Sequence, residues 1–235
     1  MLKEFQRESS ETPVEVRRLE AGDHLDQPEF HRMYAAMPPK FRAELIQGVV
    51  IVPSPLLFDH GRHHSLVMGW LLAYDAATPG TLSVDNATIL LPPDNEPQPD
   101  ASLVIEPACG GQSRQEGGYL AAAPELVVEV ASSSVSYDLH SKFRLYEQAK
   151  VREYVVVVLR EKQVRWFALD ESSRFVERSA DADGIFRSTI FPGLWLDESA
   201  LLSADAAKLL QTLRTGLASA EHATFVQALQ ARRDA

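Results

Sequence analysis

Two apolar runs separated by one helical pattern constrain the fold of this chain more than any other feature. Residues 125–131 read ELVVEVA and residues 153–160 read EYVVVVLR. Such runs are typical of strands covered on both faces, as in parallel or mixed sheets. Between them, SSSVSYDLHSKFRLYEQAK (132–150) offers hydroxyl N-cap candidates and then an amphipathic helix. A strand, a helix and a strand in this order predict a parallel crossover in one sheet, and hence an α/β fold.

The flanking segments predict further strands and helices. FRAELIQGVVIVPSP (41–55) indicates a strand pair bent at Gly48, and residues 63–80 indicate a helix that stops at a Pro-Gly pair. Residues 81–84, 87–91 and 101–106 read as short strands, followed by a Gly-rich stretch (107–118) that is either a mobile lid or a surface excursion. QVRWFAL, RFVER and IFRSTI then predict an antiparallel meander, closed by FPGLWL, and the chain from residue 197 onward reads as helical.

We expect one main domain with two appendages. A chain of 235 residues can form one well-cored domain with additional segments. Residues 1–40 are charge-rich with several prolines, and we expect a loosely attached arm with a short helix around 30–37. The main domain is expected over 41–202, and a C-terminal helical tail over 203–235.

Composition restricts the class of protein and its partners. No apolar run approaches the roughly 20 residues that span a bilayer, and the charged start lacks the apolar middle of a secretory signal, so we expect a cytoplasmic protein. The single cysteine, Cys109, excludes an internal disulfide framework and a CxxC metal site. The net charge of −10 argues against tight nonspecific binding of nucleic acid.

Three acidic residues fall where a carboxylate is costly. Glu44 interrupts an apolar strand, Asp100 follows Pro99 at the mouth of a buried strand, and Glu129 lies inside the run 125–131. A buried carboxylate must be paired or bound to a cation, and hard oxygen ligands suit Mg²⁺ or Mn²⁺. Taken singly, each has a plainer interpretation, because acidic residues at strand ends are usually solvated or capping, and Glu44 could be an ion-pair partner.

The helix after Glu129 adds a lysine. Asp138, Lys142 and Tyr146 are spaced i, i+4 and i+8, so they share one helix face. If that face turns inward, the Lys142 ammonium would lie beside the carboxylates, where it could stabilise charge that develops on a phosphate. A lysine of a surface helix more commonly extends to solvent, and Tyr146 could simply pack. The cluster His60, His63 and His64 at the helix start is interpreted as polar N-terminal residues, with His60 lining the cleft.

This ordered pattern resembles the PD-(D/E)XK nuclease superfamily. It is most similar to the restriction-endonuclease-like family often labelled Uma, in the order AELIQGVV, DHGRHHSL, PD, ELVVEV, DxxxKxxxY and FPGLWL, over about residues 41–202. The resemblance implies a mixed central sheet flanked by helices. It assigns Asp100 and Glu129 as metal ligands, Glu44 as a further acidic residue and Lys142 as the catalytic lysine. The chain departs from the superfamily pattern at Ala131, where a lysine is expected.

The leading hypothesis is therefore an endonuclease-type phosphodiesterase that depends on Mg²⁺ or Mn²⁺. We expect its substrate to be nucleic acid, with DNA favoured over RNA, and we expect the protein to form a homodimer. Asp100, Glu129 and Glu44 would be the metal ligands, and Lys142 would complete the catalytic set. One alternative is a catalytically inactive nuclease fold that acts as a binding or regulatory module. Another is that the carboxylates form a buried structural network.

Overall fold

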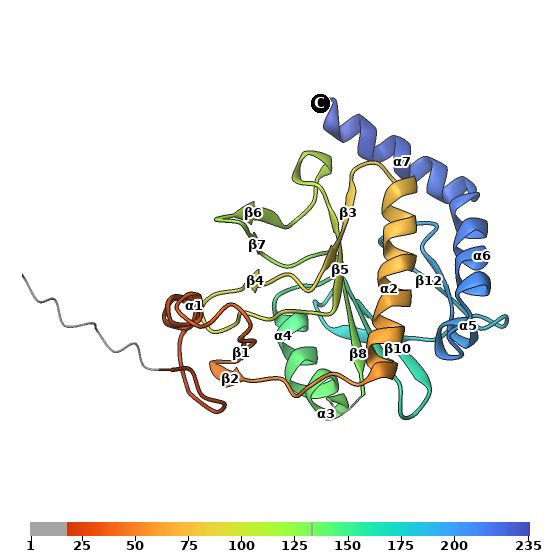
Figure 1. Ribbon diagram of the computed structural model, residues 1–235. Coiled ribbons are helices and arrows are strands. Elements are labelled where there is room, and N and C mark those ends of the chain that lie inside the picture. Colours follow the sequence, from red (N-terminus) through yellow and green to blue (C-terminus); the bar gives the residue numbers. More distant parts are fainter. Residues whose placement is uncertain (1–17, 133) are drawn as a thin grey trace, which may run out of the picture.

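A mixed sheet forms the centre of the protein (Figure 1). The computed structural model describes residues 18–132 and 134–235, so the first part of the predicted arm lies outside the described residues. The sheet has the strand order β11-β10-β9-β8-β5-β3. Its strands are β3 (Thr81–Asp85), β5 (Ala101–Ile105), β8 (Leu126–Ala131), β9 (Glu153–Val158), β10 (Gln163–Leu169) and β11 (Phe175–Arg178). The β8–β9 pair is parallel and the remaining pairs of this sheet are antiparallel, which confirms the predicted crossover and mixed sheet.

Helices cover the two faces of this sheet. The long helix α2 (Phe58–Ala77) lies on one face, and three short consecutive segments lie on the other (Figure 1). These segments are α3 (Val135–Tyr137), the π-helical η2 (Asp138–Lys142) and α4 (Phe143–Gln148). The predicted helix between β8 and β9 is therefore present, but one of its turns is π-helical.

The alternation of side chains along β8 separates two cores. Leu126, Val128 and Val130 belong to the cluster that packs against α2, whereas Val127 and Ala131 belong to the cluster beneath α4. Successive residues of a strand point to opposite faces, so an apolar run without a break can supply both clusters.

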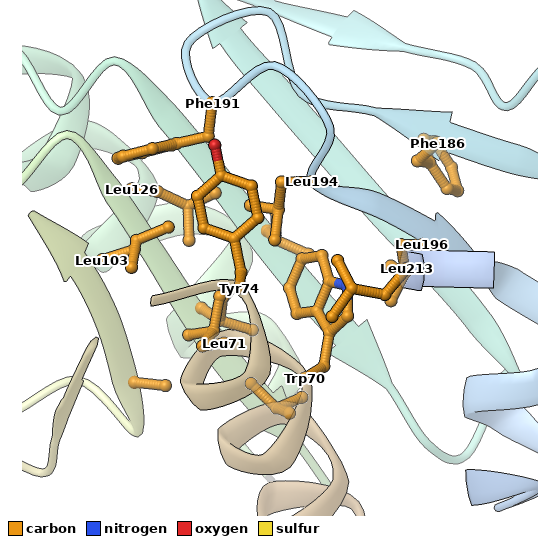
Figure 2. Close-up of a cluster of buried hydrophobic side chains, with 14 of the residues drawn as sticks. Trp70, Leu71, Tyr74, Leu103, Leu126, Phe186, Phe191, Leu194, Leu196 and Leu213 are labelled. Carbon is orange, nitrogen blue, oxygen red and sulfur yellow. The ribbon is translucent and has the colours of Figure 1, made fainter. Parts of the chain in front are cut away.

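The core beneath α2 is aromatic and almost fully apolar. Figure 2 shows Trp70, Leu71 and Tyr74 facing side chains of the sheet and of the C-terminal segments. The Trp70 indole N–H donates to the Trp195 carbonyl at 2.9 Å, and the Tyr74 hydroxyl donates to the Pro192 carbonyl at 2.9 Å. Each large side chain buried here stabilises the fold by about 1.5–3 kcal/mol.

The N-terminal segment packs against a hairpin. Strands β1 (Glu44–Ile46) and β2 (Val49–Ile51) are joined by Gln47 and Gly48, both with positive φ (51° and 75°), as a tight hairpin turn requires. The predicted strand pair with its bend at Gly48 is thus confirmed. Helix α1 (Gln27–Ala35) buries Phe30 and Met33 against this hairpin. Within residues 18–40, Leu19, Phe30 and Met33 are buried in this cluster, whereas most of the other side chains are exposed.

Three smaller elements complete the fold. The Gly-rich stretch contributes η1 (Pro107–Cys109) and one strand, β6, of a three-stranded sheet that is ordered β4-β7-β6. Its strands are β4 (Ile89–Leu90), β6 (Arg114–Glu116) and β7 (Tyr119–Ala121). The predicted meander holds for β10 and β11, whereas β12 (Ile185–Arg187) leaves it and pairs with β13 (Trp195–Asp197).

The chain ends in α5 (Glu198–Leu202), α6 (Ala206–Leu217) and α7 (Ala220–Arg233). These helices bury Leu209, Leu213 and Leu229 in the core beneath α2, so the predicted helical tail is part of the packed domain. Across the described residues, none of the helices has both the length and the apolar character that crossing a membrane requires.

Candidate active site

The strand register brings two of the predicted acidic residues together. In the antiparallel β5–β8 pair, Ala101 lies opposite Val128. Asp100 directly precedes Ala101 and Glu129 directly follows Val128, and the negative charge of Asp100 contributes to raising the pKa of Glu129. The Asp100 carboxylate also accepts the Val130 backbone N–H at 2.7 Å through Oδ2. The aspartate is therefore held at the end of β8 by the backbone of the neighbouring strand.

Lys142 lies between two further carboxylates. Its Nζ is 2.9 Å from Glu129 Oε1 and 3.0 Å from Glu44 Oε1. Glu44, Glu129 and Lys142 are 8%, 4% and 4% exposed, so the lysine does not extend to solvent. The structure thus gathers these three predicted residues into one buried ion-paired group, in which Glu44 and Glu129 share a single ammonium.

The helical segment after β8 delivers this lysine together with the hydroxyl of Tyr146, and β9 contributes the hydroxyl of Tyr154. Tyr146 donates its hydroxyl proton to Glu129 Oε1 at 3.0 Å, so Tyr146 takes part in the cluster rather than only packing. Tyr154 of β9 donates to the Asp138 carbonyl oxygen at 2.9 Å, within the π-helical turn. Single π-helical turns inside helices are common at functional sites, because they redirect side chains that a regular helix would place elsewhere.

Burial and charge together set the protonation of the cluster. Burial raises the pKa of Glu129 well above its usual value, against the opposing effect of Lys142. Burial alone would lower the pKa of Lys142, but Glu129 and Glu44 together raise it well above its usual value. Burial also raises the pKa of Asp138 to about 6. The carboxylates of Glu44, Glu129 and Asp138 therefore outnumber the single ammonium with which they interact.

His60 contacts both Asp100 and the end of β8. Its Nδ1 lies 2.8 Å from the Val130 carbonyl oxygen, which can only accept, so Nδ1 carries a proton. Its Nε2 is 3.4 Å from Asp100 Oδ1 and makes no hydrogen bond with any residue that the structure describes. Burial acts to raise the pKa of Asp100. The contacts with His60 and with the Val130 N–H outweigh burial, so the pKa of Asp100 is lowered. His60 thus holds Asp100 from the α2 side.

The residues fit a divalent cation held by two carboxylates. Within the described part of the chain, no group of three His, Cys, Asp or Glu side chains lies close enough to hold a metal ion. Glu44 Oε1 is engaged by Lys142 and by the Gln98 N–H at 2.7 Å. Mg²⁺, however, commonly binds through one or two carboxylates and otherwise uses water and phosphate oxygens, a requirement that Asp100 and Glu129 can meet. The excess of negative charge and the unpaired His60 Nε2 beside Asp100 are compatible with this.

Tyr137 is the neighbour that the sequence did not reveal. Its ring centroid is 6.0 Å from Lys142 Nζ. Its hydroxyl is buried and has no hydrogen-bond partner among the described residues. Burial raises the pKa of Tyr137, and the negative charge of Glu44 adds to this effect. No spacing rule distinguishes this tyrosine from a packing residue, so only the three-dimensional arrangement identifies it.

Comparisons with known proteins agree with this arrangement of elements. The model of the Uma2 family, described as a putative restriction endonuclease, matches residues 27–199. A search of curated proteins finds no match. A crystal structure of a putative nuclease from Anabaena variabilis is similar to this chain, with a TM-score of 0.58 and 15% sequence identity. That match covers 74% of this chain and 97% of the other. At this identity the structural likeness shows the fold alone.

Proposed function

Because the chain belongs to the Uma2 family of putative restriction endonucleases, we propose that it is a phosphodiesterase that cleaves nucleic acid internally with Mg²⁺ or Mn²⁺. Families with a restriction-endonuclease-like fold generally use a divalent metal, and a nuclease-type function is what the family supports. The choice of ion and of DNA as the substrate belongs to our proposal. The observation that carries it is the buried Lys142 ammonium beside Glu129, with the Asp100 carboxylate held at the backbone N–H of Val130, the residue after Glu129.

Asp100 and Glu129 would hold the cation. When bound, such an ion lowers the pKa of a coordinated water and polarises the phosphate. Glu44 and Glu129 both hold the Lys142 ammonium, since Nζ lies at 3.0 and 2.9 Å from the two carboxylates. Held in this way, the ammonium would offset negative charge that develops on the phosphate during attack. His60 would keep Asp100 in place through its contact at the end of β8.

The test is cleavage by the purified chain with and without metal. Single- and double-stranded DNA and RNA are incubated with Mg²⁺, with Mn²⁺ and with EDTA. We expect cleavage with metal and none in EDTA. Asp100→Asn and Glu129→Gln should each lower the rate at least about a hundredfold, because each removes a ligand charge at the reacting centre.

Glu171→Gln is the matched control, since Glu171 is exposed and lies outside both the cluster and the hollows of the protein. It makes the same chemical change and should cleave as the parent does. Thermal melting of each variant shows whether it is folded. Parent protein that leaves every substrate intact with both metals would exclude the proposal, as would full activity of Asp100→Asn.

A binding or regulatory protein is the second candidate. It is favoured by Ala131, which stands where the superfamily pattern has a lysine, and by the net charge of −10. It predicts that all substrates stay intact and that titration calorimetry detects no uptake of Mg²⁺ or Mn²⁺. A purely structural network predicts the same, and in addition a loss of thermal stability in Glu129→Gln that metal does not alter. The predicted homodimer can be tested in the same preparations by measuring the molar mass in solution.

A further inference from the structure

A hollow of about 630 Å³ lies on the other side of the helical segment that carries Lys142. Ser132, directly after β8, and Arg160, two residues after the end of β9, line it. We call it the strand-end hollow, because it opens where the parallel strands β8 and β9 end. In open α/β sheets, ligands bind preferentially beyond the carboxyl ends of the strands, and this volume suits a small molecule.

The floor of the strand-end hollow is apolar and partly aromatic. It is formed by Val135, Leu139, Phe143 and Phe167. The rings of Phe143 and Phe167 meet edge to face, with centroids 4.9 Å apart. An aromatic floor of this kind offers a stacking surface for a planar ring, and stacking on aromatic side chains is a common way of holding a nucleobase.

The rim of the hollow carries spare positive charge. The side chain of Arg160 is exposed and has neither an ion pair nor a hydrogen bond with any residue that the structure describes. Arg165 is paired with Glu177 and lies over the Phe167 ring at 5.2 Å. Against these groups the hollow has one carboxylate, that of Glu161. On a chain with a net charge of −10, the unpaired guanidinium of Arg160 favours an anionic ligand at this position.

A second hollow of similar size lacks an unpaired arginine. It measures about 620 Å³ and is lined by Asp94, Glu116 and Arg114, among others. Its arginine is already paired, because Arg114 Nη2 lies 2.9 Å from Glu116 Oε2. Volume alone therefore does not distinguish the two hollows, but the unpaired guanidinium of Arg160 does.

We propose that the strand-end hollow binds a nucleoside phosphate, with the base on the aromatic floor and the phosphate at Arg160. Two sources share this chemistry: one nucleotide of a bound nucleic-acid strand, or a free mononucleotide. The first source rests on the proposed function. Glu129 and Ser132 are separated by roughly 10 Å along the direction of β8. A nucleic-acid strand held at the carboxylate cluster could therefore place a neighbouring nucleotide in the hollow.

The experiment measures binding without catalysis. In EDTA, the full chain is titrated by calorimetry with 5′-dAMP, with deoxyadenosine and with inorganic phosphate. We expect saturable binding of 5′-dAMP and weaker binding of the two fragments. Arg160→Ala should weaken 5′-dAMP binding about tenfold or more, because it removes a charge-assisted hydrogen bond to phosphate.

Arg214→Ala is the matched control, since Arg214 is exposed on α6, away from the hollow. It removes the same charge and should leave the affinity unchanged. Glu129→Gln should also leave it unchanged, so the result does not depend on whether the chain cleaves nucleic acid. No saturable binding of 5′-dAMP at roughly 1 mM, or equal affinity in Arg160→Ala and the parent, would overturn the proposal.

Competition distinguishes the two sources. If a short single-stranded oligonucleotide displaces 5′-dAMP, the hollow takes a nucleotide of the strand, and Arg160→Ala should raise KM for cleavage with little change in kcat. If the oligonucleotide binds without displacing 5′-dAMP, the hollow takes the free mononucleotide.

Discussion

On one face of β8, Leu126, Val128 and Val130 pack beneath α2, whereas on the other face Glu129 lies beneath α3 and α4. The first face stabilises the fold by removing apolar surface from water, with no directional requirement. The second face buries charges, whose desolvation is offset only by close pairing. The two sides of one strand therefore separate stability from chemistry. An apolar pair would serve a purely structural purpose at least as well as the ion pairs around Lys142.

Trp70→Ala tests the apolar face and should have the largest effect on stability. Trp70 is 1% exposed and donates a hydrogen bond to the Trp195 carbonyl. Its truncation should lower the free energy of unfolding by about 3–5 kcal/mol. The loss should be nearly the same at pH 5.5 and pH 8, because no titrating group is exposed by the change. Urea unfolding at the two pH values measures it, and a strong pH dependence would contradict the comparison.

Lys142→Met tests the charged face. The change should lower the free energy of unfolding by about 3–5 kcal/mol at pH 8, because two buried carboxylates lose their ammonium. Here the loss should depend on pH. Without Lys142, the pKa of Glu129 in the folded chain rises further above its unfolded value, so the folded chain binds a proton more readily. Stability then increases as the pH falls, and the deficit should shrink at pH 5.5.

The double variant Lys142→Met, Glu129→Gln sharpens this test. Removal of one carboxylate together with the ammonium should recover much of the lost stability, while any nuclease activity stays absent. A double variant that is as unstable as the sum of the two single variants would show that the charges are not coupled.

Asp138→Asn should stabilise the protein more at high pH than at low pH. Burial raises the pKa of Asp138 in the folded chain to about 6, above its unfolded value. Between these values the folded state binds more protons than the unfolded state, so the parent loses stability as the pH rises through about 6. Asparagine cannot ionise and avoids this loss. We expect its advantage over the parent to grow by about 1–2 kcal/mol between pH 5 and pH 8, measured by urea unfolding.

Tyr137→Phe and Tyr146→Phe form the matched pair with the smallest effects. The Tyr137 hydroxyl is buried without a partner in the described structure, so its removal should change stability by less than about 0.5 kcal/mol. Tyr146 donates to Glu129, and its loss should cost about 1–3 kcal/mol. Equal losses in thermal melts would show that Tyr137 has a partner in solution, such as a bound water.

The local features of the fold could be predicted from the sequence where one pattern dominates. The apolar runs gave β8 and β9 as strands, and the positive-φ requirement at Gly48 gave the β1–β2 hairpin. The i, i+4, i+8 spacing predicted that Asp138, Lys142 and Tyr146 share one helix face, and the structure buries all three. The alternative interpretation of Glu44 as an ion-pair partner describes its contact in the structure. These features depend on residues close in sequence or on strong burial.

Features that depend on distant pairing could not be predicted in this way. Strand β6 has no buried residue, so nothing in its sequence signals a strand, and its sheet forms only when β4 joins β7. Strand β12 reads as a continuation of the meander, and its true partner β13 is defined by packing against the C-terminal helices. The contact of His60 with Asp100 likewise depends on how α2 meets the end of β8.

The salt bridge between Glu44 and Lys142 joins residues about a hundred positions apart, a separation that makes a contact slow to form during folding. On the ribosome, the hairpin that carries Glu44 emerges well before the helix that must supply its cation. A chain interrupted before that helix would hold unneutralised acids and no assembled centre. Any nuclease activity of this protein would therefore begin only after most of its synthesis, which protects the cell's nucleic acids from incomplete chains.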